Sequence, residues 1–147
     1  MFEFFVPGRV APQGSKRYVG GNKASGGRFI EASKYLPAWR KAVTTVASEY
    51  MTELDQKPLT GPVELTVWFY LERPKSISRT KRFFPIVPPD VDKLVRAICD
   101  SMTDGGVWDD DAQVIALSAH KLYDDFHEAG AHIMVQALDT PVDDVLL

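Results

Sequence analysis

Residues 88–114, PPDVDKLVRAICDSMTDGGVWDDDAQV, predict an amphipathic helix followed by a tight turn. From residue 91 onward, apolar side chains recur three and four residues apart, which is the spacing of one buried helical face. They are Val91, Leu94, Val95, Ile98 and Met102. We expect Asp90 to cap this helix, the Gly-Gly pair at 105–106 to end it, and Trp108 to anchor the turn that follows.

Strand patterns lie on both sides of this helix. Residues 63–72, VELTVWFYLE, alternate between two faces, which predicts a core strand. Its core face is expected to consist of Val63, Leu65, Val67 and Phe69. Residues 2–6 predict a short first strand, and two further strands are expected within residues 112–124 and 129–138.

A second helix is expected from Ser33, as its N-cap, to about Leu54. Its apolar positions are Leu36, Trp39, Val43, Val46 and Tyr50. Residues 12–33 are dense in Gly, Ser and Lys and predict a long basic hairpin or loop, with residues 28–31 as a returning strand. Residues 73–89 contain four prolines among several Lys and Arg residues, so we expect an extended, mobile, basic loop.

This order of elements predicts an α+β fold, a two-layer sandwich in which helices pack on one face of a mixed β-sheet. The length of 147 residues favours a single domain over residues 1–147, with a loose acidic tail at 139–147. The chain has no apolar run of about 18 residues and no basic region before its first strand, so we expect a cytoplasmic protein that binds no membrane. Cys99 is the single cysteine, which excludes an internal disulfide.

The charges of the chain divide at Pro89. Residues 1–89 hold 14 Lys and Arg against 7 Asp and Glu, whereas residues 90–147 hold 3 against 13, which together recover the net charge of −3. A basic half can contact phosphates and an acidic half can collect divalent cations, as a metal-dependent nuclease requires. The alternative is that charges segregated in sequence mix again in the folded molecule.

The helix and turn described first hold seven carboxylates. Asp92, Arg96 and Asp100 stand four residues apart and therefore project from one helical face. Asp90 lies at the helix N-terminus, where free backbone N–H groups favour an ionised carboxylate. The turn can bring a carboxylate of the run at 109–111 back toward that N-terminus. Three converging carboxylates would repel one another without a hard cation, and oxygen-only ligation suits Mg²⁺ or Mn²⁺.

Such a site fits phosphodiester hydrolysis, because a bound cation polarises the phosphoryl oxygen and Arg96 can stabilise charge in the transition state. Each motif also has a structural interpretation. An Asp-x-Asp at a helix start is commonly a cap, and a run of three Asp residues is commonly a turn. Arg96 would then form an ion pair with Asp92, four residues earlier on the helix.

The pattern P-D-x-D, a cation four residues later, an Asp further along the helix, and then G-x-W-x-D-D-x-Q-V resembles the RusA family of Holliday-junction resolvases. The resemblance spans residues 89–114. It implies a homodimeric, Mg²⁺-dependent α+β nuclease that resolves branched DNA, above all four-way junctions, in recombination and repair. It implies catalytic acids and metal ligands at Asp90, Asp92 and Asp111, with Asp110 beside them.

The sequence departs from the family pattern at two positions. Lys93 stands where Asn commonly follows the second Asp, and its effect on the metal geometry is open. The catalytic lysine of the family falls at Arg96, which keeps the charge and can bind phosphate bidentately but cannot readily donate a proton. A general-acid role at this position is therefore open. Asp100 is a further acid of the pattern, for which a structural role is open.

Basic residues outside the acidic run are predicted to contact DNA phosphates. They are Lys16, Arg17, Lys23 and Arg28 in the hairpin, Arg73, Lys75, Arg79, Lys81 and Arg82 in the loop, and Lys93 on the helix. Phe83 and Phe84 follow the loop cations, and we expect them to tuck into the core rather than stack at a branch point. His120, His127 and His132 lack metal-ligand spacing and are expected on strand surfaces or in loops.

Other functions stay open at this point. A metal-dependent phosphohydrolase acting on nucleotides would use the same carboxylates, but it gives the basic loops no role. A non-catalytic branched-DNA-binding protein would hold a structural cation there, and the sequence does not decide between four-way junctions and forks or flaps. A dimer would pair two sites through Trp108, through Phe83 or Phe84, or through the strand that holds Ile115 and Leu117.

Overall fold

The computed structural model describes residues 1–14, 17–20, 28–30 and 34–139. Its main sheet has the strand order β1-β6-β4-β5. The strands are β1 (Phe2–Pro7), β4 (Val63–Leu71), β5 (Val114–Tyr123) and β6 (Gly130–Ala137). β6 runs antiparallel to both β1 and β4, whereas β4 and β5 are parallel. The sheet is therefore mixed, as predicted.

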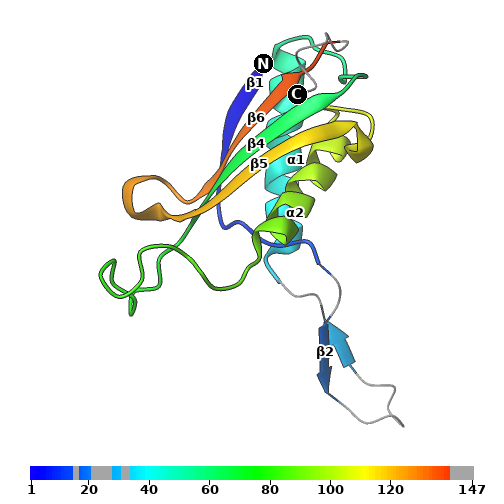
Figure 1. The fold of residues 1–147 in the computed structure, drawn as a ribbon. Coiled ribbons are helices and arrows are strands. Elements are labelled where there is room, and N and C mark those ends of the chain that lie inside the picture. Colours follow the sequence, from blue (N-terminus) through cyan, green and yellow to red (C-terminus); the bar gives the residue numbers. More distant parts are fainter. Residues whose placement is uncertain (15–16, 21–27, 31–33, 140–147) are drawn as a thin grey trace.

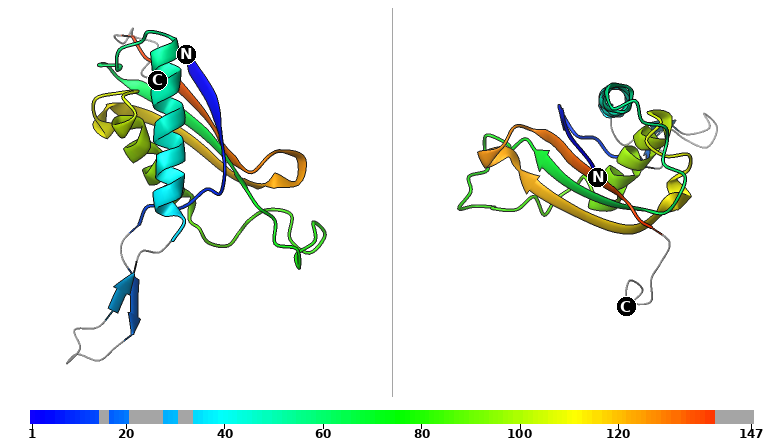
Figure 2. Two further views of the ribbon diagram at one scale, coloured as in Figure 1. Left: turned by 180° about the vertical axis from the view of Figure 1, so that it is seen from behind. Right: turned by 90° about the horizontal axis from the view of Figure 1, so that it is seen from above.

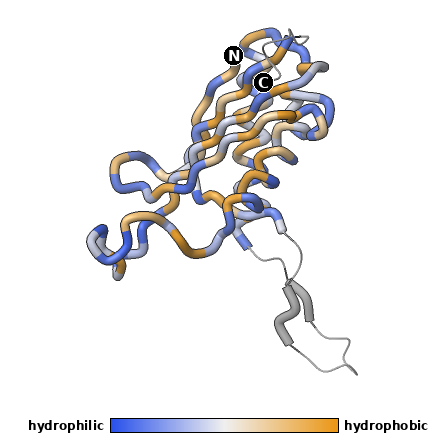
Figure 3. The backbone as a smooth tube through the Cα atoms, in the orientation of Figure 1, coloured by the Kyte–Doolittle hydropathy of each residue, from blue (hydrophilic) through white to orange (hydrophobic). Residues whose placement is uncertain are grey.

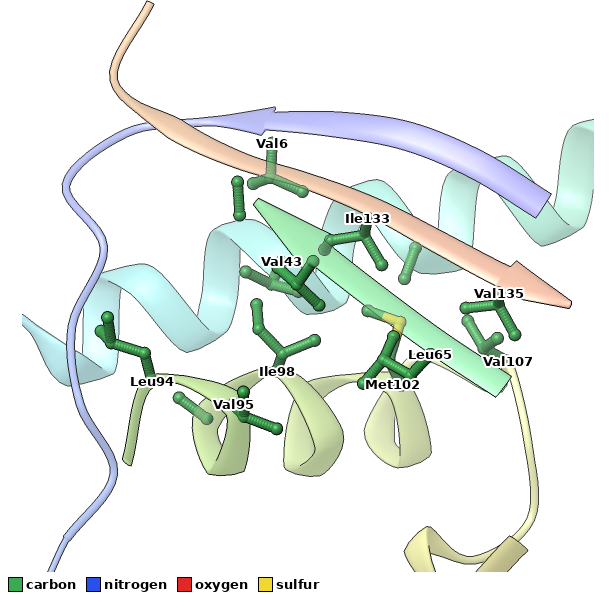
Figure 4. Close-up of a cluster of buried hydrophobic side chains, with 14 of the residues drawn as sticks. Val6, Val43, Leu65, Leu94, Val95, Ile98, Met102, Val107, Ile133 and Val135 are labelled. Atoms are coloured by element: carbon green, nitrogen blue, oxygen red, sulfur yellow. The ribbon is translucent and has the colours of Figure 1, made fainter. Parts of the chain in front are cut away.

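Two helices cover one face of this sheet (Figures 1 and 2). They are α1 (Leu36–Glu53) and α2 (Val91–Asp104), and they pack against each other as well as on the sheet. The core side chains of β4 are fully buried, and they are the four that alternation predicts, Val63, Leu65, Val67 and Phe69. In Figure 4, Val43 of α1, Ile98 and Met102 of α2 and Leu65 of β4 lie in one apolar cluster. The α+β prediction is confirmed.

The hydropathy of the chain follows this arrangement. Along the strands, hydrophobic and hydrophilic residues alternate (Figure 3), because only one sheet face meets the helices. On the other face the ring of Trp68 lies near the imidazoles of His120 and His132, with ring centroids 5.7 and 5.3 Å away. These two histidines are surface residues of strands, as expected. Among the described residues, no helix is long and apolar enough to cross a membrane.

The start of α1 differs from its prediction. The N-cap is Tyr35, whose side chain makes no capping hydrogen bond, and Pro37 stands in the first turn. Ser33 lies outside the described residues, and its prediction as N-cap is wrong because the helix begins at Leu36. Proline favours the first helical turn, where its missing N–H has no intrahelical partner to lose. The fully buried face is Leu36, Trp39, Val43, Ala47 and Met51, while Val46 and Tyr50 pack at its margin.

Helix α2 agrees more closely with the sequence. Asp90 occupies the N-cap position, although its side chain makes no capping hydrogen bond. Gly105 is the C-cap, and Gly106 turns the chain with φ of 78°. Leu94, Val95, Ile98 and Met102 are buried as predicted, whereas Val91 is exposed. The first turn of α2 therefore extends beyond the apolar core.

The basic segment after β1 forms a two-stranded hairpin, β2 (Arg17–Gly20) and β3 (Arg28–Ile30), as predicted. It projects from the end of the molecule where α1 and α2 begin (Figure 1). The loop between β4 and α2 emerges at the same end. Two basic segments that are far apart in sequence thus flank the N-terminus of α2.

The junction of β1 and β6 requires glycine at position 130. Gly130 has φ of 148°, and a Cβ atom there would stand 2.2 Å from the carbonyl oxygen of Val6. Any side chain would push β6 away from β1, which pairs with it from Phe2 to Pro7.

Candidate catalytic site and basic groove

The polar face of α2 presents the charged residues that the sequence singled out. Asp92 and Arg96 are exposed, and Asp100 is partly buried. None of the ion pairs formed among the described residues joins Arg96 to Asp92. The structural interpretation of Arg96 as the ion-pair partner of Asp92 therefore has no support in this geometry.

The side chain of Asp111 returns to α2 after the Gly-Gly turn. Its Oδ1 accepts hydrogen bonds from the hydroxyl of Thr103 and from Nε1 of Trp108, the latter at 3.1 Å. The indole of Trp108 is buried and also donates to the Thr103 hydroxyl at 2.9 Å. Trp108 thus anchors the turn, as predicted, and orients Asp111.

From the sequence we expected a carboxylate of the run at 109–111 to return to the N-terminus of α2, but Asp111 does not do so. It lies beside Thr103 in the last turn of the helix and close to Asp100 in its middle. The turn contains too few residues to carry the chain back along all of α2. The expectation of a return to the helix N-terminus was therefore wrong.

Asp100 and Asp111 form a pair of neighbouring carboxyl groups. Burial raises the pKa of Asp100, and the charge of Asp111 and a hydrogen bond with it raise this pKa further. The guanidinium groups of Arg40 and Arg96 act in the opposite direction. The net effect disfavours two ionised carboxylates at this place, which is the situation that a bound cation relieves.

The other members of the Asp109–Asp111 run have local structural roles. The Oδ1 atom of Asp110 accepts a hydrogen bond from the backbone N of Ala112 at 2.8 Å and caps a 3-10 turn, η2 (Asp111–Gln113). Gln113 accepts from the backbone N–H groups of Asp109 and Asp110, each at 2.9 Å, and donates to the carbonyl oxygens of Leu59 and Gly61. This turn holds Asp111 in place.

The N-terminus of α2 is fixed by a residue that sequence reasoning missed. Nζ of Lys121 in β5 donates to the carbonyl oxygens of Val87 and Pro89, both at 2.8 Å. Asp90 follows directly, and its carboxylate lies 3.8 Å from Nζ of Lys93. Its signal in the sequence was weak, because Lys121 lies in a strand that also holds Ser118 and His120.

A groove of about 1040 Å³ reaches this end of α2. It is lined by residues of the chain after β1 and before α1, by the end of β4 and by residues within 85–89. Asp90 and Lys93 line it as well. Cations outnumber acids along the groove: Arg9, Lys34, Arg73, Lys75 and Lys93 stand against Glu72 and Asp90. The first of the predicted catalytic acids therefore borders a basic groove.

Comparison with known proteins bears on this arrangement. The family model described as endodeoxyribonuclease RusA matches residues 7–136. This chain belongs to the RusA family. A relative in Bacillus subtilis (strain 168), the uncharacterized protein YqaN, is 30% identical over 143 residues, covering 91% of this chain and 94% of YqaN. The RusA match includes both basic segments and all the acids discussed above, and it indicates an endodeoxyribonuclease.

The RusA family implies a divalent cation, and the carboxylates of this chain fit one in chemistry. Among the described residues, no three His, Cys, Asp or Glu side chains are grouped so as to hold an ion together. Mg²⁺ does not require such a cage, because it is commonly bound by one or two carboxylates with water and substrate phosphates. The Asp100–Asp111 pair provides oxygen ligands of that kind. Asp90 and Asp92 offer two more at the start of α2.

In this RusA-family chain the loop at 73–89 is held by Arg73. The guanidinium of Arg73 binds Asp125 at 2.6 and 2.7 Å and donates to the carbonyl oxygens of Ile77, Arg82 and Phe83. All its nitrogens are thus engaged within the protein, which leaves a phosphate contact at Arg73 without support.

The remaining predicted DNA contacts are placed differently. Lys75, Arg79, Lys81 and Lys93 are exposed, Arg82 is partly buried, and Lys16 and Lys23 lie outside the described residues. Arg17 and Arg28 belong to β2 and β3. Arg82 donates to the hydroxyl of Tyr123 at 3.0 Å, and the guanidinium of Arg79 lies 4.9 Å from the ring centroid of Phe126.

The two phenylalanines of this loop do not enter the core. Phe83 and Phe84 are 52% and 54% exposed, and their rings contact each other edge to face at 4.9 Å. The expectation that they are core residues was wrong, because Arg73 holds the loop by its backbone carbonyls and no apolar surface is needed to fix it. Their exposure leaves them available for stacking on DNA.

Proposed function

We propose that this RusA-family chain is a Mg²⁺-dependent, structure-specific endodeoxyribonuclease that resolves four-way (Holliday) junctions by paired symmetric nicks in recombination and repair. The observation that carries the proposal is the position of Asp90, which both borders the basic groove and begins the helix that carries Asp92, Arg96 and Asp100. A DNA strand in that groove brings its phosphates to the acids of α2.

The residues of α2 and η2 divide the chemistry between them. Because these acids lie at two places along α2, we assign them as two sets of oxygen ligands for Mg²⁺ (or Mn²⁺): Asp90 and Asp92 at its start, and Asp111 with Asp100 toward its end. Asp110 was predicted as a ligand from the sequence, but its Oδ1 atom is engaged as a cap, so we assign it a secondary role. When bound, Mg²⁺ supplies Lewis acidity toward the scissile phosphate. Arg96 holds a fixed positive charge where negative charge grows in the transition state.

The basic segments supply binding rather than chemistry. In the proposal, Lys16, Arg17, Lys23 and Arg28 of the hairpin contact one arm of the junction. Lys75, Arg79, Lys81, Arg82 and Lys93 contact the strand nearest α2, and Arg73 keeps their loop in shape. Such phosphate contacts do not depend on the base sequence of the DNA, and salt weakens them.

Junction resolution requires two sites, which a two-fold homodimer provides. Trp108 is buried within one subunit and is not available for the contact. Ile115 and Leu117, 65% and 54% exposed on the edge strand β5, are the better candidates. Mixing wild-type subunits with Asp92→Asn subunits tests the dimer on a supercoiled cruciform plasmid. Mixed dimers should give nicked circles. Linear products from a protein that stays monomeric on DNA would contradict resolution by a homodimer.

A cleavage assay separates this function from its alternatives. A labelled four-way junction, a fork, a duplex and a single strand are each incubated with the protein in Mg²⁺ or in EDTA. We expect symmetric nicks in the four-way junction in the presence of Mg²⁺ and no nicks in EDTA. Binding without cleavage would favour a non-catalytic branched-DNA-binding protein, and hydrolysis of nucleotides without DNA cleavage would favour a phosphohydrolase. Preferred cleavage of the fork would reassign the substrate.

A further inference from the structure

The side chain of Arg40 in α1 forms hydrogen bonds to two parts of the chain outside its own helix. Its Nη2 donates to Oδ2 of Asp104, the last residue of α2, at 2.8 Å. Its Nη1 donates to Oε1 of Gln13, in the segment after β1, at 3.3 Å. This partly buried guanidinium therefore joins α1, α2 and the segment after β1, which are far apart in the sequence.

Gln13 continues the network to the other end of α2. Its backbone N–H donates to the carbonyl oxygen of Lys93, in the first turn of the helix, at 2.9 Å. The next residue, Gly14, lies so close to the helix that a Cβ atom there would stand 3.3 Å from Cδ of Lys93. Pro12, which precedes Gln13, lines the basic groove. Through Gln13 and Arg40, the groove segment is thus connected to both the first turn and the last residue of α2.

The end of α2 that Arg40 reaches is packed tightly on α1. A Cβ atom at Gly105, the C-cap of α2, would stand 3.1 Å from the carbonyl oxygen of Thr44 in α1. Burial raises the pKa of Asp100, one turn before the end of α2, and the charge of Arg40 is the strongest influence that opposes this rise. Arg40 therefore lies beside the acids at this end of α2 as well as at the contact between the helices.

The placement of α2 matters because the acids and the groove belong to different segments. Asp92 and Asp100 are carried by α2, whereas Arg9 and Pro12 line the groove from the chain after β1. DNA held in the groove meets the acids correctly only if α2 keeps its position relative to that chain. A misplacement of about 1 Å can reduce a catalysed rate about 100-fold.

We propose that Arg40 is a positioning residue of the nuclease, which fixes α2 against the segment lining the basic groove so that the acids of α2 keep their places relative to bound DNA. In this role Arg40 contacts neither the DNA nor the metal. An isolated ion pair on a surface has little effect because water screens it, whereas Arg40 binds two partners in one network. The inference rests on the proposed nuclease function and adds a residue that the sequence did not single out.

Arg40→Gln tests this role because it removes the charge and the forked set of donors. The matched control is Lys41→Gln, which removes one positive charge from the adjacent, exposed residue of α1. Single-turnover cleavage at saturating protein in Mg²⁺ and gel-shift affinity in EDTA are measured on the full chain. We expect Arg40→Gln to cleave roughly tenfold more slowly, with a dissociation constant within about twofold of the wild-type value. Lys41→Gln should match the wild type in both measurements.

Further variants separate position from charge. Gln13→Ala breaks the network without changing any charge and should slow cleavage as Arg40→Gln does. The double variant Arg40→Gln/Gln13→Ala should cleave no more slowly than the slower single variant, because both changes disrupt the same network. Arg40→Lys keeps a positive charge opposite Asp104 and should recover part of the rate.

Amide hydrogen exchange at Gln13 reports on the network without DNA or metal. The Gln13 N–H is bonded to the carbonyl oxygen of Lys93, so release of the segment exposes it to water. It should exchange several-fold faster in Arg40→Gln than in the wild type, and at the wild-type rate in Lys41→Gln. Unfolding temperatures are measured in parallel, and all variants should stay within a few degrees of the wild type.

The outcomes separate this role from the nuclease function itself. A wild-type cleavage rate in Arg40→Gln, or unchanged exchange at Gln13, would overturn the inference. Equal losses of rate and affinity would also overturn it, because Arg40 would then be a DNA contact, as would an equal loss of rate in Lys41→Gln. A wild-type protein that nicks forks in place of junctions would contradict the proposed function and not this inference, since the rates on any DNA that is cleaved serve the test.

Discussion

Nζ of Lys121 donates a hydrogen bond of 2.8 Å to the carbonyl oxygen of Pro89, and this bond ties the edge strand of the sheet to the residue that precedes Asp90. The same ammonium group holds the carbonyl oxygen of Val87. Burial lowers the pKa of Lys121, and the nearby charge of Asp90 opposes that change. The backbone entering α2 is therefore fixed by a side chain from outside the acidic segment.

Lys121→Met should lower the rate of junction cleavage more than it lowers junction affinity, because it frees the segment that places Asp90. Loss of the two hydrogen bonds should also reduce the free energy of unfolding by about 1–2 kcal/mol. Lys121→Arg keeps the charge and the donors and should recover much of the rate. Lys57→Met, an exposed lysine far along the chain, is the control. Equal rates for both methionine variants would remove Lys121 from the site.

Asp90→Asn, Asp92→Asn and Asp111→Asn should each abolish nearly all cleavage while junction binding stays equal or becomes tighter, because each change removes both a metal ligand and a charge that repels phosphate. Single-turnover cleavage and gel-shift affinity measure the two effects. Asp109→Asn is the matched control, since Asp109 is exposed and only its backbone N–H is engaged in the turn. Near wild-type cleavage by any of the three variants would exclude that residue as a ligand.

Arg96→Ala should reduce the cleavage rate roughly 100-fold with a smaller effect on binding, because its charge is assigned to the transition state. Arg96→Lys should retain activity, since the charge remains at the same helical face. Rate constants at saturating protein, with separate dissociation constants, distinguish the two effects. Equal losses in rate and affinity for the alanine variant would make Arg96 a docking residue.

The ion pair between Arg73 and Asp125 should make stability depend on pH. The hydrogen bond from Arg73 lowers the pKa of Asp125 below its ordinary value of 3.8. The folded protein therefore favours the ionised carboxylate, and this stabilisation is present above pH 3.8 and lost as the pH falls through the lower folded value. Asp125→Asn should lower the unfolding temperature at pH 7, and the difference from the wild type should shrink below about pH 4. A difference that persists at pH 2 would contradict this assignment.

Alanine at Arg79, Lys81 and Arg82 together should weaken binding to every DNA shape, because these cations contact phosphates and not bases. For duplex DNA, the slope of log affinity against log salt should become shallower by about 0.9 for each phosphate that is no longer neutralised. Titrations of a junction and a duplex at several salt concentrations provide the measurement. An unchanged slope would place this part of the loop away from DNA.

Periodicity predicted the elements of this fold but not their neighbours. The alternation in residues 63–69 identified the buried face of β4, and the spacing in α2 identified Leu94, Ile98 and Met102. Neither pattern contains the information that β6 lies between β1 and β4, because alternation describes one face of a strand and not its pairing partner. The strand order became known only from the structure.

The candidate site was partly predictable, because helical periodicity fixes the relative positions of residues on one helix but not their contacts with other elements. Residues on one helix have fixed relative positions, so Asp92, Arg96 and Asp100 could be placed together from their spacing. The place where Asp111 meets α2 depends on Trp108 and Thr103, and the exposure of Phe83 depends on the bonds of Arg73 to backbone carbonyls. Such tertiary contacts leave no periodic signal.

The pairing of β1 with β6 also determines how late in synthesis the sheet can be completed. Residues 2–7 are synthesised long before their partners in β6, which lie more than 120 positions further along the chain (Pro7 pairs with Gly130). Until β6 fills the position between β1 and β4, both of those strands expose unpaired edges and apolar faces. A nascent chain that stalls before residue 130 therefore holds the acids of α2 over a sheet that lacks the strand joining β1 to β4.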